Sequence, residues 1–119
     1  MIKFNSVTLD AEMVLGDTGT FSITPKLDGD TYLSDGDTVY FTVRERKTKP
    51  DGTEPAKKIY KVITSFTDGT ATIPIEPSDT ASLDAGTYIY DIVVNRSDGT
   101  VDTLTPNGQA YFALKKGVK

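Results

Sequence analysis

The chain of 119 residues contains no cysteine, no histidine and no tryptophan. The lack of cysteine excludes disulfides, thiolate metal sites and cysteine nucleophiles. The lack of histidine removes the commonest general base and the commonest transition-metal ligand. The sequence also has neither a Gly-x-Ser-x-Gly elbow nor a glycine-rich phosphate loop. We therefore expect a protein that is not an enzyme and that carries no cofactor.

Long hydrophobic runs are missing as well. The first six residues, MIKFNS, do not resemble a signal peptide, and no later run could span a membrane. A net charge of −4 disfavours attraction to nucleic acid. The length suits a single domain over residues 1–119, and 37% hydrophobic with 25% charged residues is typical of a soluble globular chain. We expect a chain made in the cytoplasm, with no membrane or nucleic-acid partner, unless a non-classical route releases it.

Short stretches of alternating apolar and polar residues follow one another along the chain. The clearest spans residues 37–46, where Val39, Phe41 and Val43 share one face. Five Asp-Gly pairs, beginning at 28, 35, 51, 68 and 98, mark turns. The chain holds about seven to nine such strands, with turn signals about every 8–12 residues. This cadence predicts an all-β fold, a sandwich of antiparallel strands.

A fold marker lies between a short helical turn, expected at residues 77–82, and the long strand expected at 88–96. Asp84, Gly86 and Tyr88 form an Asp-x-Gly-x-Tyr pattern at the start of that strand. The pattern resembles the tyrosine corner of immunoglobulin-like sandwiches, in which a tyrosine hydroxyl bonds to backbone a few residues upstream. Antibody domains carry a cysteine two residues later, where this chain has Tyr90. The resemblance implies a disulfide-free immunoglobulin-like β-sandwich.

The other face of the same strand is the first candidate partner surface. If Tyr88 and Tyr90 point inward, then Ile89, Asp91 and Val93 point outward. Outward apolar residues indicate a partner surface. The alternative is a central strand whose outer face is covered by a loop or by the N-terminal segment. Asp91 is expected to accept hydrogen bonds from backbone or from a nearby hydroxyl, because a buried carboxylate must be satisfied.

Basic residues gather in residues 44–61. This span has seven cationic and three acidic residues, a net charge of about +4 that leaves about −8 for the rest. A positively charged hairpin could contact phosphates or an acidic partner surface, and of the two we expect protein docking. The favoured alternative is a solvated hairpin whose charges discourage edge aggregation. The residues that would make the contact are Arg44, Arg46, Lys47 and Lys49.

Four carboxylates occur within ten residues, at Asp28, Asp30, Asp35 and Asp37. Calcium takes six to eight oxygen ligands, so these residues are a candidate site. Their spacing does not match an EF-hand loop. Because Asp-Gly is also a common turn dipeptide, solvated turns are the favoured interpretation.

The order of these segments resembles small immunoglobulin-like structural proteins of phages and prophages of Gram-positive gut bacteria. The resemblance covers nearly the full length. It rests on residues 16–19 before Phe21, 36–43, 77–80 with Leu83, 86–92, and 98–99 with 103–104. It implies a non-enzymatic virion component (of a tail, baseplate, head fibre or decoration type) made in the bacterial cytoplasm. Its partners would be other virion proteins and itself.

Two other functions stay open. One is a module that binds a host-surface glycan or protein through exposed loops and Tyr32, Tyr40 or Tyr60. Carbohydrate sites usually need aromatic platforms, and the lack of tryptophan weakens this hypothesis. The other is an immunoglobulin-like piece of a bacterial adhesin, which the missing export signal disfavours.

Overall fold

The computed structural model describes residues 3–4, 11–27, 29–45, 57–105 and 110–116. These residues form eleven strands and one short helix. The strands are β1 (Lys3–Phe4), β2 (Ala11–Val14), β3 (Gly19–Ile23), β4 (Lys26–Leu27), β5 (Asp30–Thr31), β6 (Thr38–Arg44), β7 (Lys57–Ile63), β8 (Ala71–Ile75), β9 (Gly86–Asn95), β10 (Val101–Thr103) and β11 (Ala110–Lys115). The helix α1 covers Pro77–Thr80.

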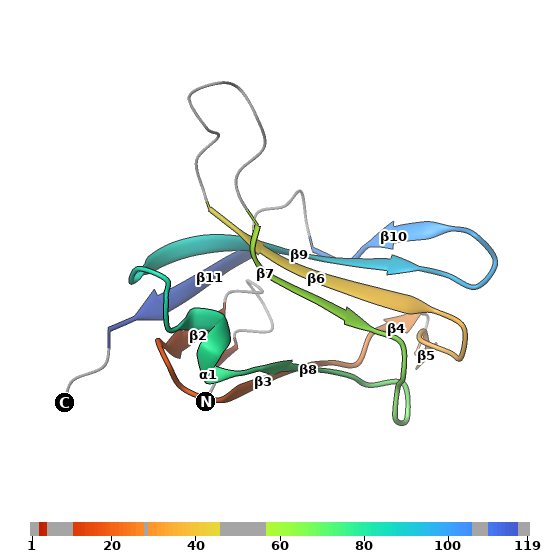
Figure 1. Cartoon of the computed structure of the whole chain (residues 1–119). Helices are drawn as coiled ribbons and strands as arrows, with labels where there is room; N and C mark the ends of the chain where they lie inside the picture. Colours follow the sequence, from red (N-terminus) through yellow and green to blue (C-terminus); the bar gives the residue numbers. More distant parts are fainter. Residues whose placement is uncertain (1–2, 5–10, 28, 46–56, 106–109, 117–119) are drawn as a thin grey trace, which may run out of the picture.

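The strands form two layers, and the fold is all-β (Figure 1). The large sheet has the order β1-β2-β11-β9-β6-β7, with β10 paired to β9 as well. A small sheet of β3 and β8 lies against one face of it, and β4 pairs with β5. The arrangement is consistent with a β-sandwich, as the alternating sequence predicts.

The core lies between the two layers. Phe21 of the small sheet packs against Phe41 and Tyr90 of the large sheet, with both ring centroids 5.4 Å away. Phe112 on β11 joins this group through Phe41 and Tyr90, each at 6.2 Å. Burying an aromatic side chain of this size contributes about 1.5–3 kcal/mol. The alternation of the strands therefore produces one shared aromatic core that joins the sheets.

The turn at Asp68-Gly69 and the helical turn expected at residues 77–82 are both present. Asp68 and Gly69 both have positive φ, 51° and 75°, as a two-residue hairpin turn of type I′ requires. Pro77 stands in the first turn of α1, where a missing N–H costs nothing. Asp79 accepts a hydrogen bond from the Glu76 N–H at 2.7 Å. The buried Thr80 accepts one from the Gly16 N–H at 2.8 Å, which fixes α1 to the turn after β2.

Two details of the predicted architecture are wrong. The described residues hold eleven strands rather than seven to nine, because β1, β4, β5 and β10 are only two or three residues long. The strands are also not all antiparallel, since β11 runs parallel to β2, with Phe112 opposite Ala11. An alternating pattern identifies the buried face of a strand but carries no information on the direction of its neighbour. The sequence pattern also predicts a first strand over residues 2–9, most of which lie outside the described residues.

Candidate functional site: the outer face of the large sheet

The outer face of β9 carries the residues that the sequence nominates for a partner. Tyr88, Tyr90, Ile92 and Val94 are buried, and the alternate residues Ile89, Asp91 and Val93 are half-buried on the other side. The predicted direction of the three side chains is confirmed. Because the three side chains are only half-buried, the outer face of β9 is neither a fully exposed surface nor a fully covered one.

Neighbouring strands explain the partial burial. Val93 lies between Tyr40 on β6 and Thr103 on β10, while Ile89 lies between Arg44 and Tyr111. β9 is therefore a central strand, flanked by β6 on one side and by β10 and β11 on the other. Side chains on adjacent strands cover much of each other on such a face.

Asp91 is held by a hydroxyl, as expected. The buried Thr105 directs its Oγ1 toward Asp91 Oδ1 at 3.5 Å and accepts a hydrogen bond from the Ile92 N–H at 3.4 Å. Both contacts are long. Thr105 follows β10 and lies beside β9, so it supplies part of the cover over Asp91.

Two exposed hydrophobic residues of this face lie on β7. Tyr60 and Val62 expose 49% and 44% of their surface. The ring of Tyr60 stacks on that of Tyr40, with centroids 6.3 Å apart and an interplanar angle of 25°. Lys57 Nζ lies 4.9 Å from the centre of the Tyr60 ring, within the range of a cation–π interaction. The outer face thus combines aromatic, aliphatic and cationic groups.

The small sheet presents a different outer face. Its exposed positions are Thr20 and Ser22 on β3 with Thr72 and Pro74 on β8. None of these four is a large hydrophobic residue, and Pro74, which has no N–H to donate to a ladder, suits an edge strand. The contrast between the two outer faces makes the large sheet the candidate contact surface.

The basic cluster is only partly described. Arg44 is half-buried at the end of β6, and Arg46, Lys47 and Lys49 lie outside the described residues. Lys58 forms an ion pair with Glu45 at 3.2 Å. Lys61 pairs with Asp79 of α1 at 2.8 Å.

The Lys61–Asp79 pair has an electrostatic consequence. Burial acts to raise the pKa of Asp79, but Lys61 and the Glu76 N–H outweigh burial, so the pKa lies below its ordinary value. Lys61 lies on the core side of an edge strand, opposite Phe41. Lys58 and Lys61 of this cluster are therefore both paired with acidic side chains.

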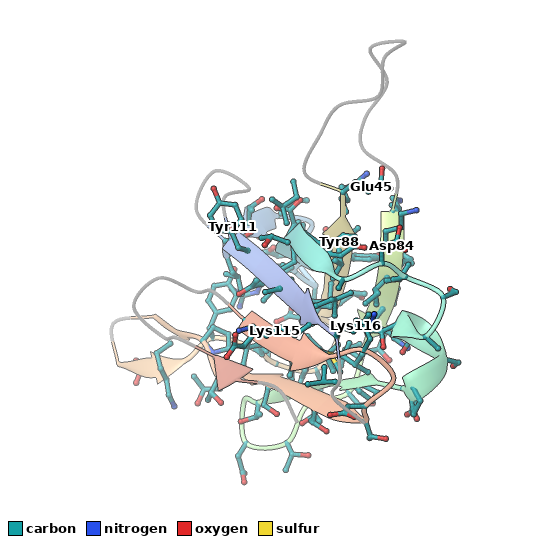
Figure 2. All side chains as sticks on the ribbon, turned by 90° about the vertical axis from the view of Figure 1, so that its left-hand side faces the viewer. Glu45, Asp84, Tyr88, Tyr111, Lys115 and Lys116 are labelled. Atoms are coloured by element: carbon teal, nitrogen blue, oxygen red, sulfur yellow. The ribbon has the colours of Figure 1, made fainter. Side chains whose placement is uncertain are left out.

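The hydrogen bond expected of the tyrosine corner is present. The Tyr88 hydroxyl donates to the backbone carbonyl of Asp84 at 2.8 Å. Figure 2 shows the two residues close together, near Glu45, where β9 begins. Burial, reinforced by the charge of Asp84, raises the pKa of Tyr88. Gly86 is the first residue of β9, and Tyr90 is 1% exposed in the core.

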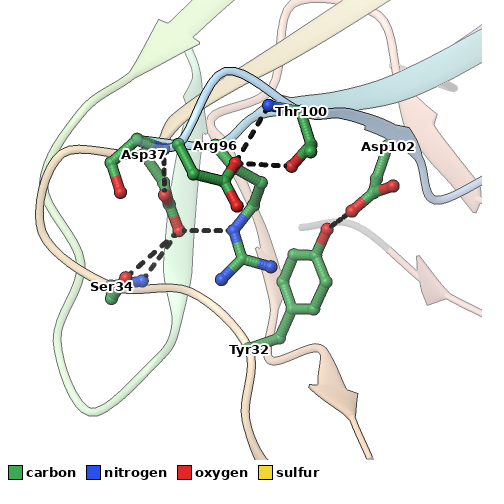
Figure 3. A network of polar contacts seen from close by, with 8 residues as sticks. Tyr32, Ser34, Asp37, Arg96, Thr100 and Asp102 are labelled. Carbon is green, nitrogen blue, oxygen red and sulfur yellow. Dashed lines mark hydrogen bonds and ion pairs between the residues drawn. The ribbon is translucent and has the colours of Figure 1, made fainter.

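A buried polar network at the opposite end of β9 was not predicted from the sequence. The fully buried Asp37 carboxylate accepts hydrogen bonds from the N–H groups of Ser34 (3.0 Å) and Ser97 (2.9 Å). Arg96 Nε lies 3.2 Å from Asp37 Oδ2 and forms an ion pair with it. The Arg96 guanidinium lies over the Tyr32 ring at 4.0 Å, and Tyr32 donates to Asp102 (Figure 3).

The network shifts the pKa of Asp37 and that of Tyr32 in opposite directions. Burial would raise the pKa of Asp37, but the two N–H donors and Arg96 lower it below its ordinary value. Burial and the Asp102 carboxylate raise the pKa of Tyr32. No sequence signal could identify these partners, because Asp37 and Ser97 are 60 residues apart.

The candidate calcium residues do not converge in the part of the chain that the structure describes. Both oxygens of Asp37 are taken by backbone N–H groups and Arg96, whereas Asp30 and Asp35 are exposed. Asp28 lies outside the described residues. Among the described residues, no group of three or more acidic side chains is placed to hold a metal.

Comparison of the chain with protein-family models, with curated proteins and with solved structures finds no match. Among the residues described, no helix is long and apolar enough to cross a membrane.

Proposed function

We propose that the protein is a non-enzymatic, immunoglobulin-like structural protein of a phage or prophage virion that acts through protein–protein contacts. The observation that carries this proposal is the contrast between the two outer faces. The large sheet exposes Tyr60 and Val62 beside half-buried Tyr40 and Val93, whereas the small sheet exposes only small or polar side chains. A face of this composition is typical of a protein contact.

The strand order supports the immunoglobulin-like assignment. In that fold strands G, F and C lie side by side, with C′ next to C in variable-type domains, and B and E pair in the second sheet. The sequence β11-β9-β6-β7 and the pair β3-β8 correspond to these positions. The Tyr88–Asp84 hydrogen bond corresponds to the tyrosine corner at the start of strand F. The packing of Tyr90 against Phe21 occupies the place of the inter-sheet disulfide.

The virion setting rests on the resemblance of the sequence to phage structural proteins. A small domain repeated on a particle needs only a weak contact in each copy, because many copies bind together. Half-buried and moderately exposed groups on the outer face suit such a contact better than a large apolar patch does.

Two observations test the setting. The genes beside this one should encode terminase, portal and tail proteins, and the protein should be recovered in particles released from its source bacterium. A neighbourhood without assembly genes, together with particles that lack the protein, would overturn the virion assignment.

A pair of matched variants tests the contact surface. Tyr60→Lys places a charge on the large-sheet face, and Thr72→Lys places one on the small-sheet face. Each tagged variant is produced in the source bacterium before particle release, and its amount in purified particles is measured by immunoblot. We expect Tyr60→Lys to be lost from particles and Thr72→Lys to be retained. Equal recovery of the two variants would contradict a contact through the large sheet.

A host-surface binding module is the second candidate function. The stacked Tyr40 and Tyr60 rings with Lys57 above Tyr60 form a small aromatic platform. Tyr32 is not part of it, because its ring lies under Arg96 and its hydroxyl bonds to Asp102. A glycan array with the purified protein tests this candidate. Strong sugar binding by a monomer, abolished by Tyr60→Ala, would favour it over the structural role.

A further inference from the structure

All three exposed large hydrophobic residues of the described chain lie on two strands of the large sheet. Tyr60 and Val62, at 49% and 44% exposure, belong to β7. Val101, at 62% exposure, belongs to β10. Val101 and Thr103 pair with Asn95 and Val93, so their side chains share the outer face with Tyr60 and Val62.

These two strands are the opposite edges of one part of the sheet. β11 pairs with the first half of β9 and β10 with its last residues. At this end of the molecule the order is therefore β10-β9-β6-β7. Among the described residues, neither β10 nor β7 has a second neighbour in the sheet.

The backbone groups of the same exposed residues point away from the sheet. Ile92 accepts from the Leu104 N–H and donates to Thr105 Oγ1, so its backbone groups face β10. In an antiparallel ladder the direction alternates from residue to residue. Val93 therefore faces β6, and Val101 and Thr103 face outward from β10.

The same alternation fixes the direction on β7. Because Val93 and its partner Tyr40 face each other, the next residue, Phe41, faces β7 and bonds with Lys61. Tyr60 and Val62 then direct their N–H and C=O groups outward. No hydrogen bond from a described residue reaches these groups. Each edge therefore combines an exposed apolar side chain with free backbone donors and acceptors, which is the requirement for strand addition.

The two edges carry opposite charges. β7 includes Lys57, Lys58 and Lys61, whereas β10 and the turn before it include Asp98 and Asp102. Two β7 edges would bring lysines together, and two β10 edges would bring aspartates together. A contact between a β7 edge and a β10 edge joins unlike charges instead.

Direction and register also match. β10, β9, β6 and β7 alternate in direction, so a second copy displaced along the sheet presents its β10 antiparallel to β7. Pairing Val62 with Val101 places Tyr60 opposite Thr103 and Lys61 opposite Asp102. Lys61 and Asp102 both lie on the core side of their strands, so the opposite charges meet on one face. Within one copy Lys61 pairs with Asp79 and Asp102 accepts from Tyr32, and both would keep these partners while contacting each other.

We propose that a second copy of this chain adds its β10 strand to the β7 edge and so continues the large sheet from one copy to the next. This inference rests on the proposed function, for which it names the partner and the contact. The contact is heterologous, because a different edge takes part on each side, so it generates a ring or a filament rather than a closed dimer. A three-residue strand gives a weak contact in each copy, which repetition strengthens.

Cysteine cross-linking tests the proposal, since the natural chain has no cysteine. Three samples of the purified protein are treated with a short bismaleimide over a range of concentrations: Val62→Cys alone, Val101→Cys alone, and the double variant. We expect the double variant to give a ladder of dimers, trimers and larger species. An equimolar mixture of the two single variants should give dimers only, and each single variant should stay monomeric.

Two controls sharpen the result. A Ser22→Cys/Thr72→Cys variant places both thiols on the small-sheet face and should give no ladder. The second control mixes the Val62→Cys/Val101→Lys variant with the Val101→Cys variant. Because the lysine blocks the β10 edge of the first protein, the only β10 edge that can pair belongs to the Val101→Cys protein, and dimers alone should form. The ladder of the double variant should shrink as NaCl is raised, because opposite charges are screened.

Clear outcomes overturn the proposal. Dimers from Val62→Cys alone would show a symmetric β7–β7 contact, and the lack of any ladder at millimolar protein would exclude edge pairing. Neither result affects recovery of the protein in particles, which tests the proposed function separately. If Tyr60→Lys is lost from particles while no ladder forms, the large-sheet face binds a different protein and the edge pairing is wrong.

Discussion

The guanidinium of Arg96 lies 3.2 Å from the carboxylate of Asp37, whose side chain is fully buried. Asp37 directly precedes β6, and Arg96 directly follows β9. The ion pair therefore joins the ends of the two central strands of the large sheet (Figure 3). It also places Arg96 over the ring of Tyr32, so one cation serves a buried acid and an aromatic ring.

Removing the cation should be costly. Arg96→Met keeps much of the side-chain volume but leaves the Asp37 carboxylate buried without its counter-charge, and we expect a larger loss in the free energy of unfolding than breaking an exposed ion pair causes. Urea unfolding measures it. The matched control is Lys115→Met, which breaks an exposed ion pair with Glu12 (2.9 Å) and should cost less than about 1 kcal/mol. Equal losses in the two variants would contradict a structural role for Arg96.

Acid should weaken the same network. The pKa of Asp37 in the folded state lies below its ordinary value of 3.8. The contribution of this carboxylate is therefore fully present above that value and is lost as the pH falls through the lower, folded-state pKa. We expect the free energy of unfolding of Asp37→Asn to fall less steeply with acid than that of the natural protein. Urea unfolding of both proteins between about pH 2 and 7, a range that spans the ordinary pKa values of carboxyl groups, provides the comparison. Parallel pH profiles would show that Asp37 does not titrate with a lowered pKa.

Removing the Tyr88 hydroxyl tests the tyrosine corner. Tyr88→Phe removes the hydroxyl that donates to Asp84, and we expect it to cost about 1 kcal/mol, the net value of a typical hydrogen bond. Tyr60→Phe is the control, because it removes a hydroxyl from a residue that is 49% exposed. Its melting temperature should stay within error of the natural protein. An unchanged melting temperature in Tyr88→Phe would count against the corner.

Local features of the fold were predictable because local rules determine them. The alternation in β6 follows from one buried face, and the hairpin turn follows from the positive φ that Asp68 and Gly69 tolerate. The tyrosine corner was predictable from a short motif and the direction of Ile89, Asp91 and Val93 from a period of two.

Relationships between distant segments were not predictable. The parallel pairing of β2 with β11 depends on where the chain ends meet, and the partners of Asp37 come from 60 residues away. The sequence likewise did not show that Tyr60 and Val101 lie on free edges. Edge status depends on which strands fail to pair, and a strand carries no local mark of its neighbours.

The turn between β7 and β8 offers a test of a contact that spans the chain. Gly69 has φ of 75°, and a Cβ added there would lie 2.5 Å from Thr31 Cγ2 on β5. Gly16 has a similar φ of 82° but no atom within 4 Å of an added Cβ. Alanine at either position should cost about 1 kcal/mol for the left-handed backbone, and Gly69→Ala should cost more because of the clash. Thr31→Ser removes the clashing methyl group. Adding it to Gly69→Ala should therefore remove the extra loss in the free energy of unfolding, as measured by urea unfolding. A double variant no more stable than Gly69→Ala would show that the turn does not pack against β5.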